Sequence, residues 1–378
     1  MSPLSSRDRV ITALNHDEPD RVPADLGGSQ NSTIHIEAYV RLLKYLGIEP
    51  QKPPSIRKVA QTVNEIEPIL LDRLHVDCVG ITPGAPDHSR DMDLPNGDWQ
   101  DEFGVVRRRT PSSKTYDLHR SPLSGQIDIE DVEAFAWPDP DDPGYRRGLN
   151  EKARFLYQHT DRALVGYLLY NIIHMAQYLR GFDNWFMDFA ENPALSHALH
   201  KRCADLTIEV ARHFLEAVGE YVQIVMFSDD IAGQQGLMIS PQAFRDIIKP
   251  QWKRLFACIR QHTKAKLALH CCGNITPILD DIVELGVDVI NPVQLAAKNM
   301  DSAFLKGKYG DKLSFWGGID TQHVLPYGSP ENVTNEVRRR IEDLATGGGY
   351  LLAASHTIQP DVSPENICAM FDTERSLR

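Results

Sequence analysis

The stretch KLALHCCGNITP, residues 266–277, combines three features that decide the fold. It begins with a short apolar run in which apolar and polar residues alternate little. This is typical of a strand buried on both faces of a parallel sheet. A glycine then marks a turn. Thr276-Pro277 gives a helix-start signal, because a hydroxyl residue at the cap followed by proline suits the first helical turn. The stretch therefore predicts a strand, a short loop and a helix in succession.

The same combination recurs along the chain. Amphipathic helical segments separate the apolar runs, and Ser-Pro start signals recur at 240–241, 329–330 and 363–364. Eight parallel strands alternating with helices predict a (β/α)₈ TIM barrel. A doubly wound open sheet is the alternative, but it would leave eight strands with no dinucleotide-binding loop. The eight predicted strands are residues 22–27, 76–82, 163–169, 223–228, 266–272, 287–292, 313–318 and 350–355.

Two segments depart from the repeat. A helical extension over residues 7–16 precedes the first strand and is placed to close the bottom of the barrel. Between the second and third strands, residues 84–162 form an insertion that carries polar strand-like pieces at 101–109 and 115–120, separated by PSSK. These pieces predict an antiparallel hairpin over one end of the barrel. We therefore predict one domain, residues 1–378, with the insertion inside it.

Composition excludes several classes of function. The chain of 378 residues carries 40 basic and 52 acidic side chains, a net charge of −12, which argues against nucleic acid as the main partner. No apolar run reaches the roughly 18 residues of a membrane-spanning helix, and the N-terminus lacks a secretory signal. Six cysteines, two of them adjacent, do not resemble a disulfide framework. We therefore expect a cytoplasmic protein, with no membrane or nucleic-acid partner and with an oligomeric state that composition leaves open.

Candidate functional residues are sought where strands end, because a (β/α)₈ barrel carries its site there. The residues that follow the predicted strands are polar and include carboxylates, imidazoles and a thiol. Asp230, Asp320 and Asp25 are candidates for catalysis. The candidates for substrate binding are Asn31, Tyr170, Asp229 and Gln294.

His270 and Cys272 lie at the most informative of these strand ends. Residues i and i+2 of a strand point the same way, so the two side chains share a face that Cys271 does not. Imidazole and thiolate are preferred zinc donors, and His356 after the last strand is the best third ligand. From spacing alone, an active-site role without metal is as good an interpretation, and a role as buried polar groups of the core is the more common one for such a pair.

The chain resembles the uroporphyrinogen decarboxylase superfamily, including its corrinoid-dependent methyltransferase branch. The resemblance runs nearly end to end. It implies a (β/α)₈ barrel with its site at the carboxyl ends of the strands. The segments that carry it are RDRVITALNHDEPDRVP (7–23), DEFGV (101–105), SDDIAGQQGLMISPQAF (228–244), LHCCGN (269–274), NPVQ (291–294), KLSFWGGIDTQHVL (312–325) and GGGYLLAASHTIQPDVSPENI (347–367).

Two branches of the superfamily differ after the first strand. Decarboxylases resembling this chain carry arginines there that hold the carboxylates of the tetrapyrrole. This chain reads ADLGGSQNSTIHIEAY at 24–39, with no arginine between Arg21 and Arg41. Arginine is the side chain best suited to bind a carboxylate, because its guanidinium can donate two parallel hydrogen bonds. Its absence here favours a smaller or less anionic substrate.

The methyltransferase branch implies a zinc site built from His-x-Cys and a later cysteine. His270 and Cys272 match the pair, whereas His356 stands where the later cysteine would be. Imidazole is an acceptable zinc donor. The resemblance thus implies zinc held by His270, Cys272 and His356, with Asp230 and Asp320 orienting ligands or accepting a proton.

The leading hypothesis is a methyltransferase that moves a methyl group between a corrinoid, carried on a small separate protein, and a small thiol or other heteroatom substrate. A carboxy-lyase related to uroporphyrinogen decarboxylase is the alternative, with Asp25 or Asp230 and His356 handling the proton that replaces the carboxylate. A barrel that binds a ligand without catalysis is the third reading.

Overall fold

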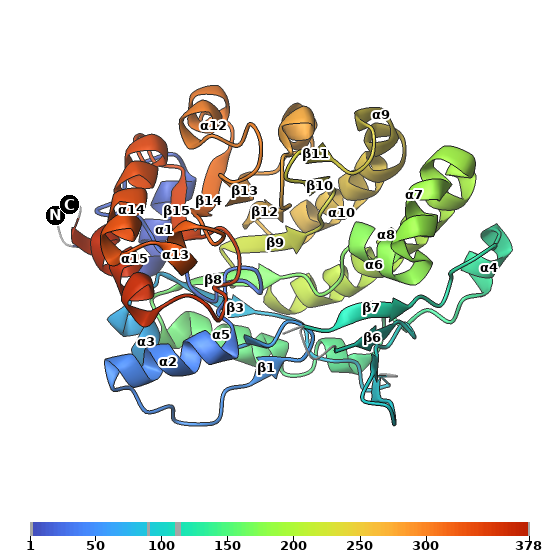
Figure 1. Ribbon diagram of the computed structural model, residues 1–378, viewed down its shortest axis with the longest axis horizontal. Coiled ribbons are helices and arrows are strands. Elements are labelled where there is room, and N and C mark those ends of the chain that lie inside the picture. The colour runs from blue at the N-terminus through green and yellow to red at the C-terminus, as the bar shows by residue number, and fades with distance from the viewer. Residues whose placement is uncertain (1–2, 89–90, 110–114, 377–378) are drawn as a thin grey trace.

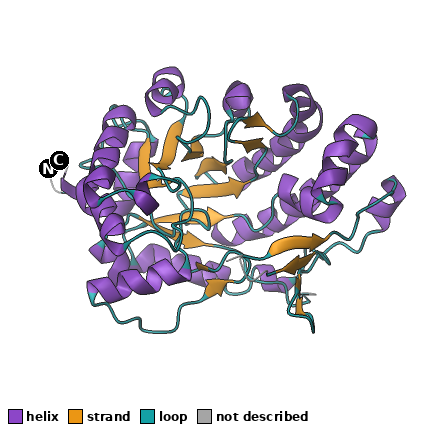
Figure 2. Cartoon of the chain, viewed as in Figure 1, coloured by secondary structure: helices purple, strands orange, loops and turns teal. Residues whose placement is uncertain are grey.

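The computed structural model describes residues 3–88, 91–109 and 115–376. Its centre is a seven-stranded parallel sheet in the order β15-β14-β13-β12-β9-β8-β3. The sheet curls, and helices cover its outer side (Figure 2). The strands are β3 (Cys78–Ile81), β8 (Ala163–Tyr167), β9 (Ile224–Ser228), β12 (Lys266–His270), β13 (Val289–Val293), β14 (Ser314–Ile319) and β15 (Tyr350–Ala354).

The predicted first strand, residues 22–27, is reduced to a single bridge. Ala24 pairs in parallel with Leu352 of β15. On the other side, the Ala24 carbonyl accepts a hydrogen bond from the Asp77 backbone N–H, just before β3, at 2.8 Å. The strand is short because Pro23 has no N–H to donate and Gly27, at φ 83°, turns the chain away. This segment nevertheless links the two edge strands, so the eight-membered TIM-barrel-like arrangement is confirmed.

Most helices of the outer layer follow the predicted alternation (Figure 1). Ser240 and Ser329 cap their helices as predicted, and Ser363 accepts from the Asn366 N–H, whereas Thr276 begins a 3₁₀ turn. In the described part of the chain, no helix combines the length and apolar character needed to cross a membrane. The helices are α1 (Ser6–Leu14), α2 (Ile36–Leu46), α3 (Pro68–Arg73), α4 (Ile129–Ala134), α5 (Leu149–His159), α6 (Ile173–Arg180), α7 (Phe182–Glu191), α8 (Pro193–Val218), α9 (Pro241–Ala243), α10 (Lys249–His262), α11 (Leu279–Glu284), α12 (Ser302–Tyr309), α13 (Val324–Tyr327), α14 (Pro330–Leu344) and α15 (Pro364–Ser376).

Helix α1 closes the bottom of the barrel, as predicted for residues 7–16. Val10 and Leu14 of α1 are buried against side chains that point inward from the barrel strands. Together these side chains form an interior hydrophobic cluster. Its remaining residues are Cys78, Ala163, Val165, Tyr167, Ile224, Met226, Ala268, Val289, Trp316, Leu351 and Ala353.

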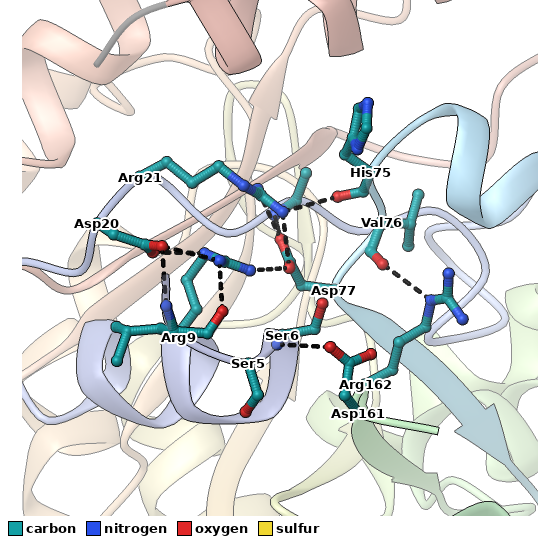
Figure 3. Close-up of polar contacts among 12 residues, drawn as sticks. Ser5, Ser6, Arg9, Asp20, Arg21, His75, Val76, Asp77, Asp161 and Arg162 are labelled. Carbon is teal, nitrogen blue, oxygen red and sulfur yellow. Dashed lines mark hydrogen bonds and ion pairs between the residues drawn. The ribbon is translucent and has the colours of Figure 1, made fainter. Parts of the chain in front are cut away.

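A network of buried charges fastens this end of the barrel (Figure 3). Asp77, which is fully enclosed, pairs with Arg9 of α1 at 2.7 Å and with Arg21 at 2.8 Å. Arg9 also pairs with Asp20 at 2.7 Å, and Arg21 lies 3.4 Å from Glu374 of α15. The segment RDRVITALNHDEPDRVP therefore supplies structural ion pairs at the bottom of the barrel, opposite the carboxyl ends of the strands.

The predicted hairpin of the insertion is part of a four-stranded antiparallel sheet, β4-β5-β6-β7. Strands β6 (Val106–Arg108) and β7 (Asp117–Arg120) pair as predicted, while the PSSK between them lies outside the described residues. Strands β4 (Met92–Asp93) and β5 (Trp99–Gln100) extend the sheet. The sheet lies beside α6 (Figure 1), where the Leu123 N–H donates to the Leu179 carbonyl.

Helix α5, also within residues 84–162, packs on α8 and β8 and belongs to the outer layer of the barrel. Two short hairpins complete the structure. They are β1 (Ile56–Arg57) with β2 (Thr62–Val63), and β10 (Ala232–Gly233) with β11 (Gly236–Leu237).

Candidate metal centre

Three of the predicted residues meet at the carboxyl ends of β12 and β15. His270 is the last residue of β12, Cys272 lies two residues beyond it, and His356 follows β15. Each offers one ligand atom, and these atoms all lie within 4.8 Å of one another. The His270 Nε2 is 3.4 Å from the Cys272 Sγ, and the two imidazole ring centres are 5.5 Å apart. Among the described residues, no other group of His, Cys, Asp and Glu side chains has this metal-binding arrangement.

The tautomer of His270 is fixed by Asn291, which lies opposite it in the parallel register of β13. The Asn291 Nδ2 donates to the Trp316 carbonyl at 3.2 Å, so the Asn291 Oδ1 is the atom that faces the His270 Nδ1, at 2.5 Å. The proton of the neutral ring is therefore on Nδ1, and the lone pair is on Nε2. This arrangement presents Nε2 as a ligand atom toward Cys272.

Burial sets the charge of the three side chains. It lowers the pKa of His270, and it lowers the pKa of His356 to about 4 with a further contribution from His270. Burial, together with Asp230, raises the pKa of the Cys272 thiol. Both imidazoles are thus neutral at pH 7, as metal ligation requires, and a thiolate at Cys272 needs a nearby cation to offset its desolvation.

Asp230 lies at the edge of the cluster, just after β9. Its Oδ1 accepts a hydrogen bond from the Cys272 backbone N–H at 2.6 Å and is 3.9 Å from the His270 Nε2. Its Oδ2 is 3.6 Å from the Nε2 of His174, near the start of α6. His174 was not among the predicted site residues, although it follows the end of β8 closely enough to count as a residue at a strand end.

Asp229, predicted to bind substrate, serves the fold instead. Its carboxylate is fully enclosed and accepts hydrogen bonds from the backbone N–H groups of Ile172, Ile173 and His174 at the start of α6. It also accepts from the Trp252 Nε1 at 3.0 Å. Strand parity explains the difference, because Asp229 and Asp230 are adjacent and point to opposite sides.

Gln294 holds the turn that carries Cys272. Its Oε1 accepts a hydrogen bond from the Gly273 N–H at 2.7 Å. Gly273 has φ 90°, and a Cβ there would come within 2.5 Å of the Gly233 carbonyl oxygen. Gln294 therefore positions the turn that carries Cys272.

Asp320 lies in its own exposed turn after β14. Its carboxylate accepts from the Gln322 N–H at 2.7 Å and lies 3.0 Å from the His323 Nδ1. Within the described residues, no contact joins it to the three-ligand cluster. The predicted role in orienting ligands has no support in this arrangement.

Asp25 and Asn31 lie in the loop after the first strand. The Asp25 Oδ1 accepts from the Gly28 N–H at 2.8 Å, while its Oδ2 makes no hydrogen bond within the described chain. Burial raises the pKa of Asp25 to about 6. The Asn31 Oδ1 is likewise buried without a partner in the described residues. Next to this loop, Gly28, Thr82 and Lys152 line part of a cavity of about 450 Å³.

Tyr170 contacts the insertion. Its hydroxyl lies 2.8 Å from that of Tyr145 and donates a hydrogen bond to the Glu102 Oε1. The ring of Phe103 packs edge-on against it at 5.4 Å. Burial raises the pKa of Glu102 to about 7. The segment DEFGV thus anchors the insertion to the loop after β8.

The fold and this cluster define a barrel of parallel strands with a polar site at their carboxyl ends. Residues 124–377 match the family model of uroporphyrinogen decarboxylase (URO-D). The chain belongs to this family, whose members are enzymes.

Known proteins similar to the chain include both decarboxylases and a methyltransferase. A uroporphyrinogen decarboxylase of Trichormus variabilis is 27% identical over 186 residues, 49% of each chain, and one of Schizosaccharomyces pombe is 25% identical over 182 residues. The chain thus spans about half the length of the curated relatives it matches. A solved methyltransferase from Methanosarcina mazei superposes with a TM-score of 0.69 over 99% of both chains at 17% identity. The similarity to the Methanosarcina mazei structure shows that the two chains share a fold.

Proposed function

We propose that the protein is a corrinoid-dependent methyltransferase that moves a methyl group between a corrinoid and a small thiol or other heteroatom substrate. The observation that carries the proposal is the cluster of His270, Cys272 and His356, with both imidazoles neutral and the His270 Nε2 directed at Cys272. These donors suit zinc, and three protein ligands leave a position open for a substrate. A bound zinc ion would lower the pKa of a substrate thiol and favour its thiolate.

The side chains around the cluster have separate tasks in this proposal. Asn291 fixes the His270 tautomer, and Gln294 and Asp230 hold the backbone of the turn that carries Cys272. Asp230, with His174 at 3.6 Å, is placed to take the proton that the thiol releases. In the transfer, the methyl–cobalt bond breaks, the carbon–sulfur bond forms, and the electron pair of the broken bond stays on cobalt. By resemblance, a small separate protein carries the corrinoid.

The experiment follows the absorbance of methylcobalamin in the presence of zinc-loaded protein and a panel of small thiols. We expect consumption of methylcobalamin by the wild type. We expect at least a 100-fold slower reaction with Cys272→Ala, because a ligand is lost, and a near wild-type rate with Cys271→Ala, whose side chain lies on the other face. No consumption of methylcobalamin with any thiol of the panel would contradict the proposal.

One observation favours a carboxy-lyase as the second candidate. Asp25 is buried with a pKa of about 6, and its Oδ2 has no hydrogen-bond partner among the described residues, so it can exchange a proton near neutral pH. In such a reaction the bond to the carboxylate carbon breaks, carbon dioxide leaves, and a proton takes its place. Formation of coproporphyrinogen from uroporphyrinogen, abolished in Asp25→Asn, would favour this candidate over methyl transfer.

A further inference from the structure

A cavity of about 720 Å³ lies at the bottom of the barrel, between α1 and the first residues of β9 and β12. Ile11 and Leu14 of α1 form its apolar wall, together with Val222 and Ala265, which precede β9 and β12. Ligand cavities in proteins usually measure about 300–1,000 Å³ and are walled mainly by apolar side chains. The cavity therefore has the size and the apolar wall of a binding site for a small molecule.

Lys266, the first residue of β12, lines this cavity and points into the barrel. Residues two apart in a strand point the same way, and Ala268 belongs to the interior hydrophobic cluster. In the register of the sheet, Lys266 lies beside Ile224 of β9, which is also a member of that cluster. The Lys266 side chain is therefore directed beneath the hydrophobic interior of the barrel and not away from it.

The ammonium group of Lys266 lacks a partner of opposite charge. Lys266 is half-buried, yet its Nζ makes no ion pair and no hydrogen bond among the described residues. Arg260 lines the same cavity and shows the contrast, because its Nη2 lies 2.6 Å from the Oδ2 of Asp288. A charge removed from water is costly unless a counter-charge accompanies it. Lys266 is thus placed to receive an anion from outside the protein.

The ends of the neighbouring helices do not occupy Lys266. Helices α8 and α10 both end at the cavity, and lysine side chains often bind the last carbonyls of a helix. Here the Val218 carbonyl accepts from the Tyr221 N–H at 2.9 Å, and the Ile259 carbonyl accepts from the Thr263 N–H at 3.1 Å. The Thr263 hydroxyl donates to the Gly219 carbonyl at 2.6 Å. These carbonyls therefore have donors other than lysine.

The charge of the cavity is opposite to that of the chain. The chain carries a net charge of −12, but the described residues that line the cavity include Arg260, Lys264 and Lys266 against one carboxylate, Glu220. Asp288 already offsets Arg260. Two lysines thus remain against one exposed carboxylate, and an added anion would balance the excess.

We propose that this cavity binds a small amphipathic anion. Its carboxylate, sulfonate or phosphate would pair with Lys266 and Lys264, and its apolar body would pack on Ile11 and Val222. The inference goes beyond the proposed function, because the cavity lies at the end of β12 opposite His270 and uses none of the candidate metal ligands. A ligand there would contact the strand that carries His270 at its other end.

The test is a fluorescence titration of the protein with two dyes of nearly the same shape. One is the amphipathic anion 8-anilinonaphthalene-1-sulfonate, and the other is N-phenyl-1-naphthylamine, which lacks the sulfonate. We expect one anionic dye per chain, bound at least 10-fold more tightly than the neutral dye. Lys266→Gln should weaken binding of the anionic dye at least 10-fold and leave that of the neutral dye unchanged, whereas Ile11→Gln should weaken both.

Lys312→Gln is the matched control, because Lys312 is an exposed lysine just before β14, outside the cavity lining. It should keep the wild-type affinity for both dyes. Hydrogen exchange should show that the anionic dye protects residues 219–223 and 260–266. Equal binding of the two dyes by the wild type, equal losses in Lys266→Gln and Lys312→Gln, or protection confined to the carboxyl ends of the strands would overturn the inference.

Discussion

The chemistry of His270 depends on two hydrogen bonds made by its neighbour Asn291. The Trp316 carbonyl orients the Asn291 amide, and the amide oxygen in turn holds the proton of His270 on Nδ1. Partners of this kind orient a metal-binding imidazole and raise its basicity. The ligand atom is therefore set by a residue that does not itself reach the cluster.

Replacing Asn291 tests this dependence. We expect Asn291→Ala to lower zinc affinity by roughly 10- to 100-fold, because the ring loses its fixed tautomer and orientation. Competition with a chelator of known affinity measures the change. Asn366→Ala, which removes a buried amide that donates to the Leu325 and Gly328 carbonyls, should leave zinc affinity unchanged. Equal losses in both variants would point to general destabilisation.

The candidate ligand residues were predictable from the sequence, but the residues that support them were not. Strand parity placed His270 and Cys272 on one face, and the strand count placed His356 at the same end of the barrel. Asn291 was missed because its role depends on which residue of β13 lies opposite His270, and register is a property of the folded sheet.

At the scale of elements, the start of α6 is fastened by Asp229. Four donors converge on this enclosed carboxylate, three from the helix backbone and one from Trp252 of α10. The contact joins α6, β9 and α10, and it positions His174 beside Asp230. A residue expected to bind substrate is thus the link that builds one side of the site.

Removal of this link should be costly for the fold. We expect Asp229→Ala to lower the free energy of unfolding by roughly 2–4 kcal/mol, because buried donors lose their acceptor. Ser240→Ala, which removes an exposed helix cap, should cost about 1 kcal/mol. Urea denaturation compares the two. A loss for Asp229→Ala no larger than that for Ser240→Ala would contradict the assigned role.

The βα elements were predictable because each carries its own local pattern of apolar run, turn and helix start. The insertion was predictable only as a hairpin, since the short strands β4 and β5 have too few residues to show a pattern. The first strand was overestimated, because Pro23 and Gly27 limit its pairing. Hydrophobic patterning detects neither strands of two residues nor the backbone limits that proline and glycine impose.

At the scale of the whole molecule, the ion pairs that stabilise the barrel and the candidate metal-binding residues lie at opposite ends of it. Arg9, Arg21, Asp77 and Glu374 join α1 and α15 to the bottom of the barrel, and the metal-binding candidates lie at the other end. Burial raises the pKa of Glu374 to about 7 from its ordinary 4.5, although Arg21 partly opposes this. The charge of Glu374, and with it the net charge of the ion-pair network at the bottom of the barrel, therefore changes with pH.

The raised pKa of Glu374 predicts a pH-dependent stability. Between pH 4.5 and 7 the folded chain keeps a proton that the unfolded chain has lost, so a rise in pH across this window removes up to about 3 kcal/mol of stability. Glu374→Gln should show a smaller decline than the wild type over this window. Glu365→Gln, at an exposed position on the same helix, should behave as the wild type. Parallel pH profiles of unfolding for all three proteins would contradict the prediction.

The most direct test of the central claim is the zinc content of the purified protein, measured by mass spectrometry after dialysis without chelator. We expect close to one zinc per chain in the wild type and in Cys271→Ala. We expect Cys272→Ala and His356→Ala to lose most of this zinc while circular dichroism shows an intact fold. A wild-type protein that takes up no zinc even when it is supplied, or equal zinc in the Cys272→Ala and Cys271→Ala variants, would contradict the account.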